Sequence, residues 1–199
     1  MLIKSGFDVA QPVDKVWRFF DDIPQVAACL PGAELTEDLG GEKYKGRVAV
    51  RMGPVRLQFA GTADITERDE AAKRVVVTAA GAEEKGRGQA SMVVTATLSR
   101  AGQGTKVAVA QDLQLSGAAA QYGRGMISDV TAVLMRDFAT NMQARIDAAD
   151  RGLSPDQVEA ARSASGFAIA MRAARLALAR VWRRFFLPYR PSTGSGVRS

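Results

Sequence analysis

The sequence predicts an α+β fold in which a curved antiparallel sheet wraps around one long helix. Between residues 44 and 117, apolar side chains alternate with polar ones every second residue, as they do in half-buried strands. In residues 118–149, apolar side chains recur at steps of three and four residues, as on the buried face of a helix. Successive strands followed by one helix favour an antiparallel sheet with the helix packed on one face.

A first strand and two short helices precede this run. Residues 2–10 have the alternation of a strand. Pro12 stands where a helix can begin, and residues 13–20 carry apolar side chains at helical spacing. A second short helix starts around Asp22 and ends at Pro31, which is followed by glycine.

About five strands follow, separated by short turns rich in glycine and charged residues. Their segments are residues 44–51, 55–66, 75–80, 89–100 and 105–117. The following apolar side chains of the strands and the long helix are expected to face the interior: Val48, Val50, Leu57, Phe59, Val94, Leu113, Met126, Val130 and Leu134. Tyr122, near the start of the long helix, either places its hydroxyl at the mouth of the interior or is an ordinary half-buried tyrosine.

Charge is unevenly distributed along the chain. Its 199 residues carry 27 Lys and Arg against 21 Asp and Glu, a net charge of +6. Residues 151–199 hold nine arginines and two acidic residues, a net charge of +7, which leaves −1 for residues 1–150. The sequence therefore predicts a domain over residues 1–150 and a basic tail over residues 151–199 with an anionic partner of its own.

Composition excludes several kinds of site. The chain has no histidine, so imidazole is not available as a general base or metal ligand. Cys29 is the only cysteine, which excludes a disulfide within the chain and leaves its thiol without a histidine to activate it. We therefore expect no metal, no covalent cofactor and no catalytic residue. The chain has no signal-peptide pattern and no run of about 18 apolar residues, which predicts a cytoplasmic protein without a spanning helix.

The basic tail contains a further helical segment, residues 156–187, which ends at Pro188. From Phe167 onward, helical steps place aromatic and aliphatic side chains on one face and arginines on the other, with three aliphatic residues among the arginines. The apolar face consists of Phe167, Met171, Leu178, Val181, Trp182, Phe185 and Phe186. The basic face consists of Arg172, Arg175, Arg180, Arg183 and Arg184.

This composition is typical of an interfacial helix that lies in the headgroup layer of an anionic membrane. One alternative is that the helix packs on its own domain or on a partner helix. A nucleic-acid contact is a second alternative, since arginine also suits phosphate, but the large apolar face argues against it. We expect peripheral attachment to the inner face of the cell membrane and no nucleic-acid partner.

Several segments of residues 1–149 resemble the CoxG family of carbon monoxide dehydrogenase subunits, which belongs to the START/Bet v 1-like superfamily with the helix-grip fold, also called SRPBCC. The resemblance rests on Pro12-Val13-Asp14-Lys15-Val16-Trp17, Asp22-Ile23-Pro24, Cys29-Leu30-Pro31-Gly32-Ala33, Tyr44-Lys45-Gly46, Arg51-Met52-Gly53-Pro54 and Phe59-Ala60-Gly61. The element that begins at Cys29 is the most specific of these.

The resemblance implies a deep apolar cavity between the sheet and the long helix, lined by the interior residues named above and by Tyr122. It also implies association with aerobic, molybdenum-containing CO dehydrogenase and with the attachment of that enzyme to the membrane. Electrons from that enzyme must reach quinones, which dissolve in the bilayer and not in water. We therefore interpret the chain as a non-enzymatic binder of a hydrophobic small molecule, an isoprenoid quinone such as menaquinone, which it carries between membrane and enzyme.

Two other functions stay open at this point. The chain could be a membrane anchor or assembly factor for CO dehydrogenase that holds no ligand. It could also be an enzyme of the cyclase or hydratase kind, as some helix-grip proteins are. An enzyme needs polar groups gathered inside the cavity, and the polar candidates are Tyr44, Gln111, Asp112, Gln114 and Tyr122. Whether these side chains point inward or outward distinguishes the enzyme from the binder.

Overall fold

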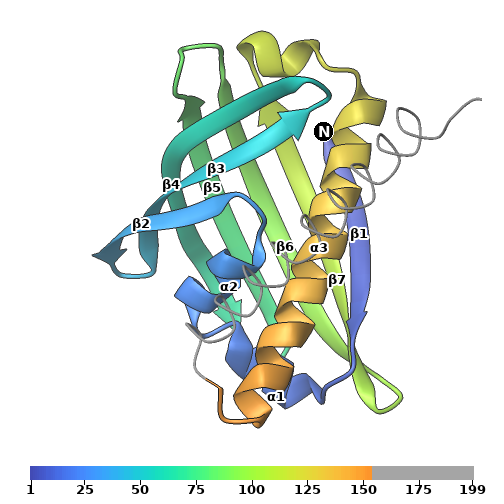
Figure 1. Ribbon diagram of the computed structural model, residues 1–199. Helices are drawn as coiled ribbons and strands as arrows, with labels where there is room; N and C mark the ends of the chain where they lie inside the picture. Colours follow the sequence, from blue (N-terminus) through green and yellow to red (C-terminus); the bar gives the residue numbers. More distant parts are fainter. Residues whose placement is uncertain (154–199) are drawn as a thin grey trace, which may run out of the picture. The chain divides into compact units, whose positions relative to one another are not determined.

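Seven strands form one antiparallel sheet that curls around a long helix (Figure 1). The computed structural model describes residues 1–153. The strands are β1 (Leu2–Val9), β2 (Ala33–Gly40), β3 (Lys43–Met52), β4 (Val55–Asp69), β5 (Arg74–Glu83), β6 (Gln89–Ala101) and β7 (Gly104–Leu115). The helices are α1 (Val13–Phe19), α2 (Ile23–Cys29), the 3₁₀ helix η1 (Gly117–Gln121) and α3 (Arg124–Asp150).

The sheet order is β1-β7-β6-β5-β4-β3-β2, so that every neighbouring pair except β1 and β7 is joined by a hairpin. The two edge strands, β1 and β2, are connected by α1 and α2. These short helices lie at one end of the curled sheet, beneath the second half of α3 (Figure 1). The chain therefore returns from one edge of the sheet to the other across the end of its concave face.

Three glycines stand in register where the sheet bends. Gly46 of β3 lies opposite Gly61 of β4, and Gly61 lies opposite Gly81 of β5. The backbones approach so closely that a Cβ on Gly61 would lie 2.0 Å from the carbonyl oxygen of Ala80. Glycine inside a strand often marks such a sharp bend, because no side chain separates the two backbones.

The link between α1 and α2 is fastened to the sheet by Arg68 of β4. Its guanidinium donates to the carbonyl oxygen of Phe20 at 3.2 Å, to Asp21 at 2.8 Å and to Glu42 at 3.1 Å. The second helix begins at Asp22, whose carboxylate accepts a hydrogen bond from the backbone of Gln25 at 3.1 Å. This N-cap satisfies one of the amide groups that every helix start leaves without a partner.

The two halves of α3 are held in different ways. The second half makes polar contacts with the segments around α1 and α2: Asn141 donates to the carbonyl oxygen of Cys29 at 2.8 Å, and Gln143 accepts from the Ala10 amide at 2.7 Å. Asp150 pairs with Lys15. In residues 124–134, the hydrogen bonds that the structure describes stay within the helix and its cap, as from Thr131 to the Ile127 carbonyl oxygen. Apolar packing is therefore what holds the first half.

The core is divided into two clusters of buried apolar side chains. We name the larger one the α1 cluster; it consists of Val9, Val16, Trp17, Phe20, Cys29, Val75, Ala96, Leu98, Val107, Val109, Met142 and Ile146. The smaller one, the hairpin cluster, lies at the β3–β4 hairpin and the start of α3; it consists of Met52, Leu57, Ala119 and Ile127. Between the two clusters, the concave face of the sheet is lined by side chains that are only partly buried.

The fold class predicted from the sequence is confirmed, with two local corrections. The sequence pattern missed β2, because five of its eight residues are polar or glycine and its outer end is exposed. It also began the long helix at residue 118, whereas a 3₁₀ helix occupies Gly117–Gln121 and α3 starts at Arg124. The alanines after Gly117 suit either helix type, which explains the difference. The predicted tail helix lies outside the described residues.

Candidate functional site

The concave face of the sheet, where α3 crosses it, is the candidate binding site. Strand register and burial identify its inward positions, since inward and outward residues alternate along each strand. On β7, for example, Val109 and Gln111 are buried while Lys106 and Asp112 are exposed. The helix passes directly over β1, where the rings of Phe7 and Phe138 meet edge to face with centroids 5.8 Å apart.

Most of the apolar residues expected in the interior lie on this face. Those buried in or packed against the hairpin cluster are Val50, Leu57, Phe59, Leu113, Tyr122 and Val130. Val94 packs against the α1 cluster, while Val48 and Leu134 are half-buried and belong to neither cluster. Met126 was expected to face the interior, but its side chain is 43% exposed. The next residue of α3, Ile127, packs in the hairpin cluster in its place.

The middle of the concave face has a floor of small side chains. Ala63 of β4 lies opposite Ala79 of β5, and both flank the row of glycines described above. Their neighbours across the sheet, Tyr44 and Met92, are also partly exposed. The inward side chains of Ala63 and Ala79 are small and keep partial exposure, so this part of the concave face is not close-packed.

Two of the five polar candidates for an enzyme lie away from this face. Asp112 and Gln114 point to the outer side and are exposed, and Asp112 pairs with the N-terminal amine at 3.1 Å. Tyr44 and Tyr122 are half-buried, and burial, with smaller contributions from Asp38 and Glu42, raises the pKa of Tyr44. Gln111 does point inward and is 9% exposed.

Within residues 1–153, two buried polar atoms on the concave face make no hydrogen bond: the hydroxyl of Ser5 and the amide nitrogen of Gln111. Both residues occupy inward positions, Ser5 on β1 and Gln111 on the adjacent β7. From the sequence, Gln111 is only one of several polar candidates, and Ser5 is not among them. The alternation of Ile3, Ser5 and Phe7 places the serine inward, which is the signal that could have found it.

A buried ion pair at the β5–β6 hairpin was also missed. Glu83 is 4% exposed, and its carboxylate accepts from Arg87 at 2.6 Å and from the backbone amides of Lys85 and Arg87 at 2.9 and 3.2 Å. The side-chain hydrogen bond from Arg87 is the main cause that lowers the pKa of Glu83 to about 2. The sequence GAEEKGRGQ is typical of an exposed turn. It gives no sign that one of its two acidic residues is buried, because that burial depends on the geometry of the hairpin.

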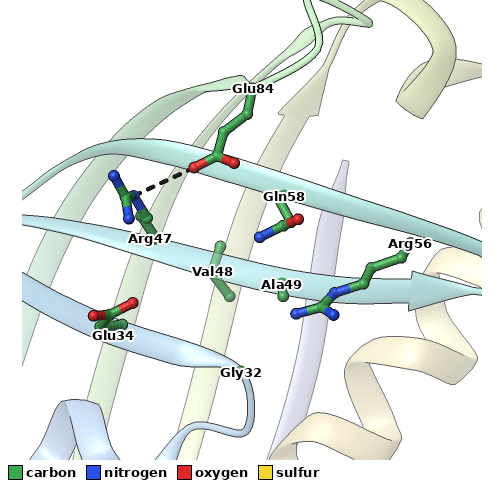
Figure 2. A pocket seen from close by; sticks show the side chains of 8 residues that line it. All are labelled: Gly32, Glu34, Arg47, Val48, Ala49, Arg56, Gln58 and Glu84. Carbon is green, nitrogen blue, oxygen red and sulfur yellow. Dashed lines mark ion pairs between the residues drawn. The ribbon is translucent and has the colours of Figure 1, made fainter.

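Two surface hollows lie on the outer side of the sheet. Figure 2 shows the first, of about 370 Å³, where Arg47 pairs with Glu84 at 3.3 Å and Arg56 and Gln58 extend from β4. The second, of about 450 Å³, lies over β5, β6 and β7 and is lined by residues such as Ala80 and Ser91. Both are lined mainly by outward side chains, so neither corresponds to the concave face under α3.

Within residues 1–153, no group of His, Cys, Asp and Glu side chains is arranged to hold a metal ion. No helix in that part of the chain is long and apolar enough to span a bilayer. Cys29 is fully buried in the α1 cluster, as expected for a small apolar side chain.

Solved structures with the same fold are similar to this chain over about three quarters of its length. A conserved protein from Geobacillus kaustophilus has a TM-score of 0.66 at 19% identity, with 74% of this chain and 95% of that chain covered. A protein from Thermus thermophilus has a TM-score of 0.54 at 16% identity and coverages of 75% and 99%. The Zhui aromatase/cyclase from Streptomyces sp. R1128 has a TM-score of 0.54 at 15% identity and coverages of 74% and 94%. At these identities the likeness shows the helix-grip fold alone.

A comparison with curated protein sequences finds no match. The family model for CoxG, a subunit of carbon monoxide dehydrogenase, matches residues 6–147, which is most of the described domain. The match begins within β1 and ends within α3, so it includes both core clusters and the concave face except for the first half of β1. The chain therefore belongs to the CoxG family of carbon monoxide dehydrogenase subunits.

Proposed function

We propose that the protein is a non-enzymatic carrier of a hydrophobic small molecule that serves aerobic CO dehydrogenase at the membrane. The observation that carries the proposal is the incompletely filled concave face. Apolar side chains there, among them Val50, Phe59 and Leu113, are half-buried although they face α3. An apolar ligand between sheet and helix would remove this surface from water, a gain of roughly 25 cal/mol per Å².

The first half of α3 supports a route into this space. Its packing against the hairpin cluster is apolar, and its polar contacts stay within the helix and its cap. Gly123 and Gly125 at its start have no atoms within 4 Å of the position a Cβ would take. Movement of this half away from the sheet breaks few specific bonds, whereas the second half stays fastened to α1 and α2.

An isoprenoid quinone such as menaquinone is the ligand that we propose. A CO dehydrogenase delivers electrons, and the quinones that accept them are dissolved in the bilayer. A quinone combines a flat apolar ring and an apolar chain, which suits a face formed by aliphatic and aromatic side chains. Family membership supports the link to CO dehydrogenase, and the half-buried apolar face supports the ligand.

Membrane recruitment through the basic tail is part of the proposal. The tail combines an arginine face with apolar residues such as Trp182 and Phe185. Each arginine near an anionic leaflet contributes about 1 kcal/mol, and the apolar face adds to this. The protein would then sit peripherally on the inner face of the cell membrane, where it exchanges quinone with the bilayer.

The arrangement of polar groups favours a carrier over an enzyme. Of the five polar candidates for an enzyme, Asp112 and Gln114 point outward, which leaves Tyr44, Gln111 and Tyr122 near the interior. None of them is a carboxylate or an imidazole that could take up a proton near neutral pH. A ligand-free anchor would have no use for a concave face of small side chains such as Ala63 and Ala79.

A pair of substitutions on β5 tests the carrier. Ala79 faces the concave side and Ala80 faces solvent, so Ala79→Leu fills the proposed space while Ala80→Leu adds the same bulk outside. Both proteins are purified from a host that makes menaquinone, and their lipid extracts are analysed by mass spectrometry. We expect quinone with the wild type and Ala80→Leu and several-fold less with Ala79→Leu. Equal amounts in the two variants would contradict binding at this face.

A further inference from the structure

We infer that Ser5 and Gln111 form a polar pair that binds an oxygen acceptor of the ligand, and so position its carbonyl headgroup on the β1–β7 side of the concave face. The inference rests on the proposed function, since it names the group of the ligand that this site selects. We call the two residues the concave polar pair.

The concave polar pair lies where the two core clusters meet. Gln111 stands opposite Ile3, which packs on the hairpin cluster, and opposite Val94, which packs on the α1 cluster. Ser5 stands opposite Val109 on the same two strands. The two polar side chains are thus diagonal neighbours, about 7–8 Å apart between backbones, and they are surrounded by apolar side chains.

One polar atom of each side chain has no hydrogen-bond partner among residues 1–153, although buried polar groups normally have one. The amide nitrogen of Gln111 and the hydroxyl of Ser5 are inaccessible to solvent and make no hydrogen bond to the described residues. Gln111 as a whole is 9% exposed, so its amide is held in the interior. A buried donor without an acceptor destabilises a fold, which makes such a pair costly unless something accepts from it.

The chemistry of the two donors defines which acceptor they bind. An amide N–H and a hydroxyl on diagonal positions can both donate to one oxygen between them when the side chains that enclose them move apart to admit the ligand. A carbonyl oxygen can accept both hydrogen bonds, because it has two lone pairs. If the rest of the molecule is apolar, its ring contacts Val94 and Leu113. A hydrocarbon of the same shape fills the same space but leaves the donors unsatisfied.

Two matched ligands test the inference: a menaquinone with a single isoprene unit, and the naphthalene hydrocarbon that has the same side chain without the carbonyl oxygens. Their dissociation constants are measured by equilibrium dialysis for the wild type, Ser5→Ala, Gln111→Met and the control Gln114→Met. Gln114 lies on the same strand but is exposed on the outer side. Because the ligands differ in aqueous solubility, the preference for quinone over hydrocarbon is compared between variants.

We expect the preference to fall about tenfold in Gln111→Met, the loss of roughly one buried hydrogen bond, and by a smaller factor in Ser5→Ala. Binding of the hydrocarbon should stay the same or tighten, which also shows that the variants are folded. If Gln111→Met, Ser5→Ala and Gln114→Met all prefer quinone over hydrocarbon to the same extent, the concave polar pair does not bind the headgroup. That result would leave the proposed apolar binding site uncontradicted. If the wild type binds neither ligand, the proposed function itself is wrong.

Discussion

Individual residues determine how sharply the sheet bends and how the stability of the domain depends on pH in acid. Gly46, Gly61 and Gly81 occupy one level of three neighbouring strands, and the sheet bends there because two backbones come closer than any side chain allows. Glu83 affects the pH dependence of stability, because hydrogen bonds from Arg87 and from backbone amides in the hairpin favour its ionised carboxylate.

The substitution Gly61→Ala should destabilise the domain strongly. Its Cβ would lie 2.0 Å from the Ala80 carbonyl oxygen and 2.5 Å from the Gly81 Cα, and both are backbone atoms that cannot rotate away. We expect a loss of about 3 kcal/mol in the free energy of unfolding, measured by urea denaturation. Gly125→Ala is the control, since nothing lies within 4 Å of its Cβ position. Equal effects of the two substitutions would contradict the close approach.

Glu83→Gln should destabilise the domain at neutral pH and lose that effect in acid. The pKa of Glu83 is about 2 in the folded protein and about 4.3 in the unfolded chain, so ionisation stabilises the fold above about pH 4. This stabilisation is lost as the pH falls from about 4 to 2. The free energies of unfolding of wild type and variant should therefore converge over that range.

Glu37→Gln is the control for this experiment, because Glu37 pairs with Lys45 at the surface, where both side chains are about half exposed. Exposed pairs of this kind contribute little. A difference between wild type and Glu83→Gln that stays constant down to about pH 2 would show that the carboxylate does not stabilise the fold by its charge.

At the scale of elements, the sequence predicted those whose residues alternate or recur regularly. The strands β3 to β7 and the helix α3 carry such patterns, and they were found. The acidic edge strand β2 was missed because its pairing with β3 depends on backbone hydrogen bonds that leave no apolar pattern. Met126 was placed inside because Tyr122, Met126 and Val130 recur at steps of four, whereas the packed helix turns Ile127 inward.

Unpartnered polar groups such as Ser5 and Gln111 could not be recognised from the sequence either. They can be recognised only when the neighbouring strands are known, and β1 and β7, which pair in the sheet, are far apart in the sequence. The periodicity of the sequence indicates on which face of a strand or helix a residue lies. Only the tertiary structure shows whether a hydrogen-bond donor on that face has an acceptor.

The difference between the two halves of α3 predicts a difference in hydrogen exchange. Amides of residues 124–134 should exchange faster than those of residues 138–150, since only the second half is fastened by side chains such as Asn141 and Gln143. Addition of a menaquinone with a short side chain should slow exchange in the first half. Uniform protection along α3, with no change on addition of quinone, would contradict the proposed entry route.

At the scale of the whole molecule, two parts of the chain have different tasks in the proposed function. The domain binds the ligand, and the basic tail binds the membrane. Residues 1–150 have a net charge of −1, which gives the domain little attraction of its own to an anionic surface.

Removal of residues 153–199 should therefore abolish sedimentation with anionic vesicles. The truncated domain should keep its thermal transition, because the buried core clusters lie within residues 1–152. A full-length variant in which Trp182, Phe185 and Phe186 are replaced by serine keeps the charge of the tail but loses apolar contact. We expect its binding to vesicles to weaken and to become sensitive to salt. Undiminished binding of the truncated domain would assign the membrane contact to the domain.

The central claim is that the full-length protein holds an isoprenoid quinone. Native mass spectrometry of the protein purified from a menaquinone-producing host, together with organic extraction, measures this directly. We predict a bound species whose extra mass matches the extracted quinone, at close to one molecule per chain. An empty chain that still sediments with anionic vesicles would contradict the carrier and support a membrane anchor without a ligand.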